Sequence, residues 1–276
     1  MNIKILQKLV GISLTGLVAL FLGACISAGA AVGGKSVPGK GARDYTAVVR
    51  TRSVFLYPDA PDASPKLDIA LSLLETRRAD RQFVLDAIYN GLGTDAYAEK
   101  RLFGYDKMYG EMRRVAERIP DMPITTLNWY YNEAFVYNAG NSRLAVISRE
   151  WEYYTGGAHG MRSKDYYVFS LEDKRLLALN DILRDEAKPA LGDLVEAELR
   201  KQAGIPDWIP LSEQGFFENS VEKLDDFFLQ PQGLGFQWDP YEIAPYSAGL
   251  IEIVIPYDKL YGMFTDLGLA LSKDIR

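Results

Sequence analysis

Hydrophobic and polar positions change their spacing several times along the chain, and each change predicts an element. Residues 44–57 are rich in β-branched and aromatic side chains and run up to Pro58, which predicts a strand. Residues 66–74 alternate Leu and Ile with Asp, Ala and Ser, the pattern of a half-buried strand. Residues 80–90 then take helical spacing, and Gly91 can end that helix in a left-handed conformation.

A stripe of aromatic and aliphatic residues predicts a second helix before Pro120 and Pro123. Its members are spaced four, three, four and three residues apart: Tyr105, Tyr109, Met112, Ala116 and Ile119. Such a stripe is more often core packing than part of a cofactor site, so we expect it to face a hydrophobic core.

From residue 125 the pattern becomes that of a meander. Trp129, Tyr131 and Phe135 are separated by multiples of two, so we predict that they are core residues on one strand face. Turn residues at 138–141 lead into a returning strand over 143–154. The segments 165–171 and 175–179 are then predicted to pair as a hairpin.

The last hundred residues mix helices with short strands. A helix is predicted from near Asp185 to Gly204, with Pro189 tolerated only in its first turn, and a shorter helix is predicted around 212–224. Strands at 227–229, 234–238 and 250–255 precede a terminal helical segment that includes Leu260, Phe264 and Leu267. Because strands and helices are grouped, we predict an α+β fold with a largely antiparallel sheet, packed helices and a two-part ectodomain.

The amino-terminal segment has the pattern of a secretory signal. Lys4 and Lys8 precede an uncharged apolar run over residues 9–22. The following Gly23-Ala24-Cys25 resembles the bacterial lipobox, in which the cysteine is lipidated after cleavage. The alternative is an uncleaved transmembrane helix with Cys25 as a buried thiol, but the apolar run is short for a span of roughly 20 residues.

We therefore expect a lipoprotein with acyl chains such as palmitate on Cys25, held on the cell envelope by this anchor. Ile26 stands where an inner-membrane retention signal would have Asp, so the outer membrane, facing the periplasm, is the expected location. Residues 26–43 are rich in Gly, Ala and Ser, as in a flexible linker. The expected parts are a signal peptide at 1–24, a lipidated tether at 25–43, a smaller α+β domain at 44–120 and a larger one at 121–276.

Charge narrows the range of partners. Removal of residues 1–24 leaves 29 Lys and Arg against 37 Asp and Glu, a net charge of −8. An acidic ectodomain repels phosphate backbones and attracts cationic partners, so we expect no binding to nucleic acid.

The inventory of reactive residues is small. The chain has one histidine, His159, and one cysteine, Cys25, so it contains no histidine pair for a metal site and no thiol nucleophile once Cys25 is lipidated. We expect no metal, no cofactor and no enzyme activity. One alternative stays open, because two carboxylates that meet in space suffice for glycoside hydrolysis.

The most distinctive internal motif is YYTGGAHG at 153–160. Its glycines permit positive φ and a close approach of the backbone, and His159 either braces the turn or contacts a ligand. We expect this turn to lie near the loop 241–249, because rigid scaffolds often display binding groups on such connections. The candidate binding residues are Tyr154, Gly156, Gly157, His159, Tyr241 and Tyr246.

Further motifs follow the first in a fixed order. They are YYVFSL at 166–171, LALNDIL at 177–183, GLGF at 233–236 and YEIAPYSAG at 241–249. Through this ordered series of motifs, the chain resembles the RsiV-like family of bacterial extracytoplasmic domains. The resemblance covers about residues 127–264. Residues 44–119 are similar to the smaller domain that often precedes the RsiV-like domain.

The resemblance implies a binding role. One member of the family is an anti-sigma factor whose extracellular part binds animal-type lysozyme, and another architecture places the domain pair beside a peptidoglycan deacetylase. We expect neither a sigma-binding region nor a deacetylase domain in this chain, so the resemblance implies binding rather than signalling. The expected function is a membrane-anchored module that binds lysozyme or a cell-wall glycan such as peptidoglycan. The alternatives are an envelope enzyme with a carboxylate pair and a structural protein without a ligand.

Overall fold

The computed structural model describes residues 44–119 and 127–275, and these form two compact units. The sheet unit comprises residues 44–137 and 142–177, and the C-terminal unit comprises residues 138–141 and 178–275. Cys25 and the tether lie outside the described residues. No helix within the described ranges is long and apolar enough to cross a membrane.

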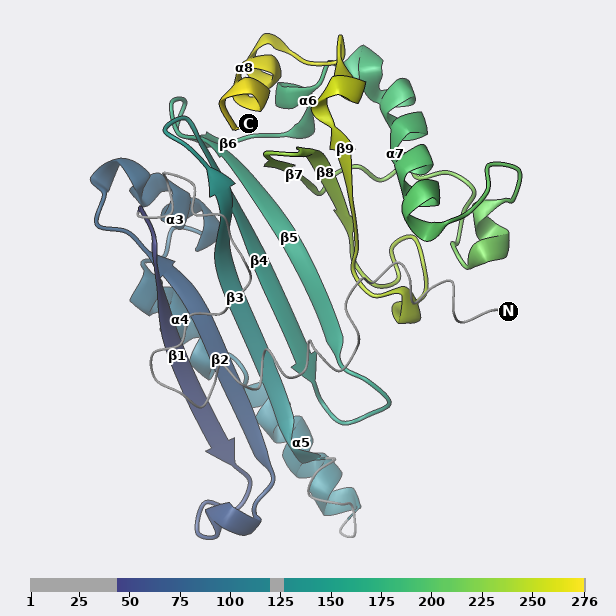
Figure 1. The fold of residues 1–276 in the computed structure, drawn as a ribbon. Helices are drawn as coiled ribbons and strands as arrows, with labels where there is room; N and C mark the ends of the chain where they lie inside the picture. The colour runs from purple at the N-terminus through teal and green to yellow at the C-terminus, as the bar shows by residue number, and fades with distance from the viewer. Residues whose placement is uncertain (1–43, 120–126, 276) are drawn as a thin grey trace. The chain divides into compact units, whose positions relative to one another are not determined.

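The sheet unit is built on six strands in the order β1-β2-β3-β4-β5-β6 (Figure 1). Neighbours pair antiparallel in β1/β2, β4/β5 and β5/β6, whereas β2 and β3 are parallel. The strands are β1 (Thr46–Phe55), β2 (Lys66–Glu75), β3 (Trp129–Gly140), β4 (Leu144–Tyr154), β5 (Met161–Ser170) and β6 (Arg175–Leu176).

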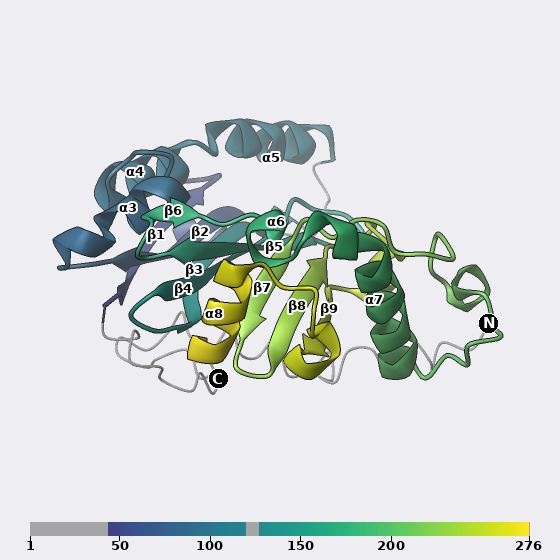
Figure 2. The same cartoon turned by 90° about the horizontal axis from the view of Figure 1, so that it is seen from above.

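Three helices connect β2 to β3 and lie on one face of this sheet (Figures 1 and 2). They are α3 (Gln82–Ile88), α4 (Thr94–Phe103) and α5 (Asp106–Arg118). The parallel pairing of β2 with β3 explains their position, because parallel neighbours require a long crossover connection. Short 3₁₀ turns are formed by η1 (Pro61–Ala63) and η2 (Ala79–Arg81).

The core of the sheet unit lies between this face and the helices. The alternating Leu and Ile of β2 are buried there, which confirms the half-buried strand. Trp129, Tyr131 and Phe135 are buried in the same core, as predicted, and Met112 of α5 is fully enclosed. The helical stripe therefore faces the core, except that Ile119 at its end is exposed.

Two local features of the sheet unit differ in how well they were predicted. Gly91 follows α3 with φ +75°, which confirms the expected left-handed position. Helix α4 was not predicted, because its apolar side chains form no continuous stripe and only Tyr97 and Ala98 are buried.

The C-terminal unit contains a three-stranded antiparallel sheet in the order β7-β8-β9. Helix α7 contacts β9, and helix α8 contacts β7 and α6. The strands are β7 (Phe227–Gln230), β8 (Gly233–Trp238) and β9 (Ile251–Pro256), and the helices are α6 (Leu179–Ile182), α7 (Lys188–Ala203) and α8 (Asp266–Ile275). The 3₁₀ segments are η4 (Asp185–Ala187), η5 (Leu211–Gln214), η6 (Tyr246–Ala248) and η7 (Tyr257–Leu260).

Helix α7 ends where predicted, and it begins at Lys188 because the expected start near Asp185 forms the 3₁₀ segment η4. Pro189 lies in its first turn, and Gly204 ends it with φ +70°. In β8, a side chain at Gly235 would occupy the space of the Phe228 ring, so the glycine lets this ring lie directly on the neighbouring strand.

The short helix expected around 212–224 is wrong in its extent. Only η5 is helical, and Gly215 ends it at φ +96°. The following backbone bonds to distant partners instead of to itself, since Phe217 N–H donates to the carbonyl oxygen of Ile243 at 3.0 Å. Periodicity cannot anticipate such a tertiary hydrogen bond.

The α+β class with a mostly antiparallel sheet is confirmed. The expected boundary after residue 120 stays a prediction about which segments fold independently. In the structure, β2 and β3 belong to one sheet across that position, and the limits of the compact units fall near residues 138, 141 and 177.

Candidate functional site

The loop between β8 and β9 carries two of the predicted binding residues. Tyr241 and Tyr246 lie with their ring centroids 5.9 Å apart and their planes inclined by 36°. Hydrogen bonds fix the loop, because Tyr241 N–H donates to the Ala244 carbonyl and Asp239 N–H donates to the Glu242 carboxylate. Glu242 also pairs with Lys223. The two rings are therefore displayed by a rigid connection.

Tyr241 has an unusual backbone. Its φ is +74°, in the left-handed region that glycine and asparagine tolerate and that costs other residues roughly 1–2 kcal/mol. Burial does not recover this cost in full, since 51% of Tyr241 is exposed. Strained residues of this kind cluster at functional sites, so the outlier points to a role for the tyrosine side chain beyond folding.

Two exposed aromatic residues that the sequence did not single out follow segments that hydrogen bonds tie to this loop or to the start of β9. Phe217 follows η5 and bonds through its N–H to the Tyr241 loop at Ile243. Trp208 follows α7, whose last turn is tied to the start of β9 by a hydrogen bond from Gln202 Nε2 to the Glu252 carbonyl. Pro206 and Pro210 around Trp208 are a turn signal that could have identified this segment. Together Trp208, Phe217, Tyr241 and Tyr246 define what we call the aromatic end.

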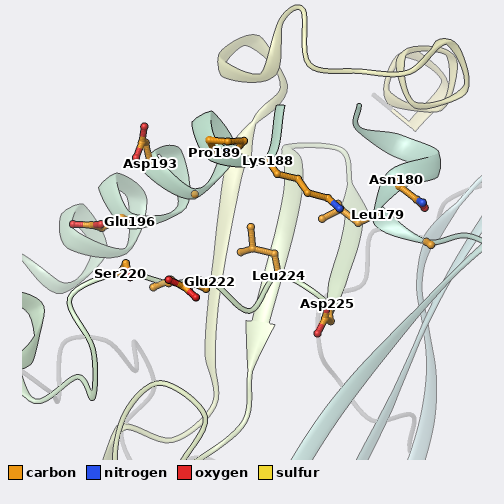
Figure 3. Close-up of a pocket in the computed structure, with 13 residues that line it drawn as sticks. Leu179, Asn180, Lys188, Pro189, Asp193, Glu196, Ser220, Glu222, Leu224 and Asp225 are labelled. Carbon is orange, nitrogen blue, oxygen red and sulfur yellow. The ribbon is translucent and has the colours of Figure 1, made fainter. Parts of the chain in front are cut away.

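A groove of about 640 Å³ lies elsewhere in the C-terminal unit (Figure 3). Helices α6 and α7 and the segment 220–225 line it. Its apolar wall includes Leu179, Pro189, Val221 and Leu224, and its carboxylates are Asp193, Glu196, Glu222 and Asp225. Lys188 is the single cation among the lining residues and pairs with Asp185 at 2.9 Å. The groove therefore has an acidic lining.

Negative charge is concentrated in this part of the chain. Residues 178–276 contain 18 Asp and Glu against eight Lys and Arg, a net charge of −10. Residues 44–177 contain 19 against 18, a net charge of −1. The C-terminal unit thus carries almost the whole charge imbalance of the described chain, and its field favours cationic partners.

The YYTGGAHG turn lies in the sheet unit, between β4 and β5. Tyr154 Oη donates to the Gly157 carbonyl at 3.1 Å and accepts from Gly157 N–H at 3.2 Å. Gly156 and Gly157 have φ of +75° and +150°, the conformations expected of them. His159 is exposed, and its Nδ1 lies 2.9 Å from the Gly160 carbonyl oxygen.

The predicted binding residues therefore fall into two groups. Tyr154, Gly156, Gly157 and His159 belong to the sheet unit, whereas Tyr241 and Tyr246 belong to the C-terminal unit. The expectation that the turn and the loop form one surface stays a prediction. No group of three or more His, Cys, Asp or Glu side chains suited to a metal ion occurs among the described residues.

The sheet unit places charge in its interior. Glu133 of β3 has a fully buried side chain and bonds with both oxygens, to Arg101 Nε at 2.8 Å and to Arg149 Nε at 2.5 Å. Tyr97 Oη donates to the same carboxylate at 2.9 Å, and burial raises the pKa of Tyr97. The carboxylate thus has three partners, as a buried charge requires.

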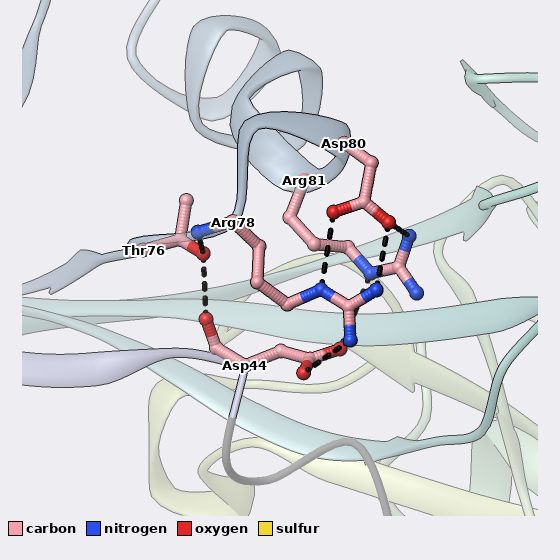
Figure 4. A network of polar contacts seen from close by, with 5 residues as sticks. All are labelled: Asp44, Thr76, Arg78, Asp80 and Arg81. Atoms are coloured by element: carbon pink, nitrogen blue, oxygen red, sulfur yellow. Dashed lines mark hydrogen bonds and ion pairs between the residues drawn. The ribbon is translucent and has the colours of Figure 1, made fainter.

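A second network of hydrogen bonds and ion pairs joins Asp44, just before β1, to the segment after β2 (Figure 4). Asp80 accepts two hydrogen bonds from Arg78, at 3.1 and 2.8 Å, and one from Arg81 at 2.9 Å. The Arg78 hydrogen bonds lower the pKa of Asp80 to about 2. Asp44 joins the network through both arginines, and Thr76 Oγ1 donates to the Asp44 carbonyl at 2.6 Å.

Comparison with known proteins finds a family match in part of the C-terminal unit. Residues 180–258 match the model of a family described as a protein of unknown function, DUF3298. A solved DUF3298 family member from Bacteroides fragilis is similar to this chain with a TM-score of 0.71 and 18% identity, over 83% of this chain and 97% of that one. A DUF3298 family protein from Pseudomonas aeruginosa gives a TM-score of 0.56 and 16% identity, over 81% and 94%.

No curated protein matches the chain. At these identities the two solved structures establish the fold alone. The four residues of the aromatic end and most of the residues that line the groove lie within the matched residues 180–258. The chain therefore carries a DUF3298 match in its C-terminal unit and has the α+β fold of solved DUF3298 proteins.

Proposed function

We propose that the protein is an RsiV-like extracytoplasmic binding lipoprotein whose C-terminal unit binds a cationic protein. The observation that carries this proposal is the net charge of −10 in residues 178–276, beside a net charge of −1 in residues 44–177. Charge of one sign on one unit steers a partner of opposite charge and accelerates its association.

The aromatic end supports a binding role independently of charge. Tyrosine and tryptophan are enriched at protein interfaces because they offer a large rigid contact area. A strained and half-exposed Tyr241 in a rigid loop has this character. The acidic field would attract the partner, and the aromatic side chains would supply the short-range contacts.

Animal-type lysozyme is the first candidate partner, because the family that the chain resembles includes a lysozyme-binding member and lysozyme is strongly basic. The test is the affinity of soluble residues 44–276 for lysozyme at low and at physiological salt. We expect binding that weakens as salt rises and that slows in association when Asp193, Glu222 and Asp225 are changed to Asn, Gln and Asn.

A matched control lies in the sheet unit. Asp59, Asp62 and Glu99 are also exposed, and the triple variant Asp59→Asn, Asp62→Asn, Glu99→Gln removes the same charge. This control should bind lysozyme like the wild type. Equal loss in both triple variants would show that only total charge matters, and no binding by the wild type would refute the proposal and favour a structural protein without a ligand.

A cell-wall glycan is the second candidate. The half-exposed Tyr241, whose ring lies beside that of Tyr246, favours it, since sugar rings pack on aromatic faces. The same protein should be tested with solubilised peptidoglycan at high salt, where charge attraction is screened. Retention of peptidoglycan under these conditions, lost in Tyr241→Ala, would support the glycan over the protein partner.

The membrane anchor is proposed from the sequence. Cys25 is the proposed site of lipid attachment, with the domain held at the outer membrane and facing the periplasm. We expect Cys25→Ala to move the protein from the detergent phase to the aqueous phase. Unchanged partitioning with the signal segment still attached would indicate a transmembrane anchor instead.

A further inference from the structure

The turn after α7 displays a tryptophan in a way that packing does not explain. Trp208 is 83% exposed, the most exposed tryptophan among the described residues. A single exposed aromatic side chain is ordinary by itself, so what distinguishes Trp208 is how its turn is held and charged. The residues on both sides are anchored, since Ile205 and Leu211 are buried.

A buried arginine fixes the backbone of this turn by hydrogen bonds. Arg200 of α7 is almost fully buried, and its Nη1 donates to the carbonyl oxygen of Ile209 at 2.7 Å and to that of Pro206 at 3.4 Å. Ile209 N–H closes the turn on the Pro206 carbonyl at 3.1 Å. Glu196 fixes the guanidinium through Nε at 2.7 Å. Trp208 is therefore one of the two central residues of a turn with little conformational freedom left to lose on binding.

The surroundings of the indole are acidic. Asp207 is its neighbour in the turn, Glu213 is exposed close by in sequence, and the unit carries a net charge of −10. An exposed tryptophan in a negative field suits a cation, because a guanidinium or ammonium group binds the face of an indole more strongly than that of any other side chain. The same charge disfavours an anionic membrane surface as the occupant.

We propose that Trp208 is an anchor for an arginine or lysine side chain of the cationic protein partner, presented by the turn that Arg200 holds. This inference rests on the proposed function and adds a specific contact to it. The indole face receives the cation, and the rigid turn reduces the entropy lost when the contact forms.

The test compares Trp208→Ala, Trp208→Leu and Trp208→Phe for their affinity for lysozyme, for a poly-arginine peptide and for solubilised peptidoglycan. We expect Trp208→Ala to weaken binding about 30-fold, the loss typical of an interface anchor, with no change in melting temperature because the side chain is exposed. Trp208→Leu should lose nearly as much, whereas Trp208→Phe should retain part of the affinity, since only the aromatic replacement preserves a π face.

Tyr261→Ala is the matched control. Tyr261 is 90% exposed in the same unit but follows the far end of β9, so its loss should leave binding unchanged. Wild-type binding with Trp208→Ala within about twofold of it would overturn the anchor and leave the proposed function standing. Full affinity in Trp208→Leu would show that the contact is apolar and does not involve a cation on the indole face. Loss of peptidoglycan binding in place of lysozyme binding would assign the indole to a sugar ring. Absence of any basic partner for the wild type would overturn both proposals.

Discussion

The two units of this protein use charge in opposite ways. In the sheet unit nearly equal numbers of acids and bases form networks that reach into the interior, of which Arg101–Glu133–Arg149 is the most buried. In the C-terminal unit acids exceed bases by ten, and Asp193, Glu222 and Asp225 of the groove are exposed.

The difference indicates which charges serve the fold and which serve the surface. A buried carboxylate between two arginines must keep its partners, because an uncompensated buried charge is strongly destabilising. Exposed carboxylates on one unit contribute little to stability and repel one another. Their accumulation on one unit is the basis of the proposed cationic partner.

The largest effect is expected from breaking the buried network. Glu133→Gln keeps the shape of the side chain but removes the charge between two guanidiniums, and should lower the free energy of unfolding by about 3 kcal/mol. Asp193→Asn, an exposed change in the C-terminal unit, should alter it by no more than about 0.5 kcal/mol. Chemical denaturation measures both. Similar effects of the two variants would remove the distinction between the units.

Substitutions of Tyr241 are expected to change stability by an intermediate amount. Tyr241→Gly and Tyr241→Ala both remove the ring, but only glycine relieves the positive φ, so Tyr241→Gly should be more stable than Tyr241→Ala by about 1 kcal/mol. Both variants should weaken lysozyme binding if the ring contacts the partner. The reverse order of stability would show that the loop is not held at this φ in solution.

Asn90 provides the control, since it also has a positive φ, +55°, but lies in the sheet unit. Asn90→Gly and Asn90→Ala should show the same order of stability with a similar gap, because both sites have a positive φ, and neither variant should affect lysozyme binding.

The smallest effect concerns the exposed network of Asp80. Because Arg78 lowers the pKa of Asp80 to about 2, below its ordinary value of about 4, the network stabilises the folded state above pH 4 and loses this contribution as the pH falls towards 2. The stability difference between the wild type and Asp80→Asn should therefore shrink over this range. In an Arg78→Gln background the difference should no longer depend on pH in this way.

Local patterns in the sequence predicted much of the fold. The alternation in β2, the helical stripe of α5, the glycine stop of α7 and the core positions of Trp129, Tyr131 and Phe135 were all anticipated. The missed helix α4 has no continuous apolar stripe, and the backbone of the irregular segment after η5 bonds to the distant residue Ile243.

For the candidate site, the sequence by itself determined the identity of the residues and the chemistry they exclude: one histidine, one cysteine, an acidic chain and a tyrosine-rich loop. Only the tertiary structure decided that Tyr241 is strained and half exposed, that Arg200 holds the Trp208 turn, and that Glu133 lies between two arginines. The physical reason is that side-chain period encodes which face of an element is buried. Exposure of one side chain and pairing across 16 or 32 residues depend instead on how separate elements pack.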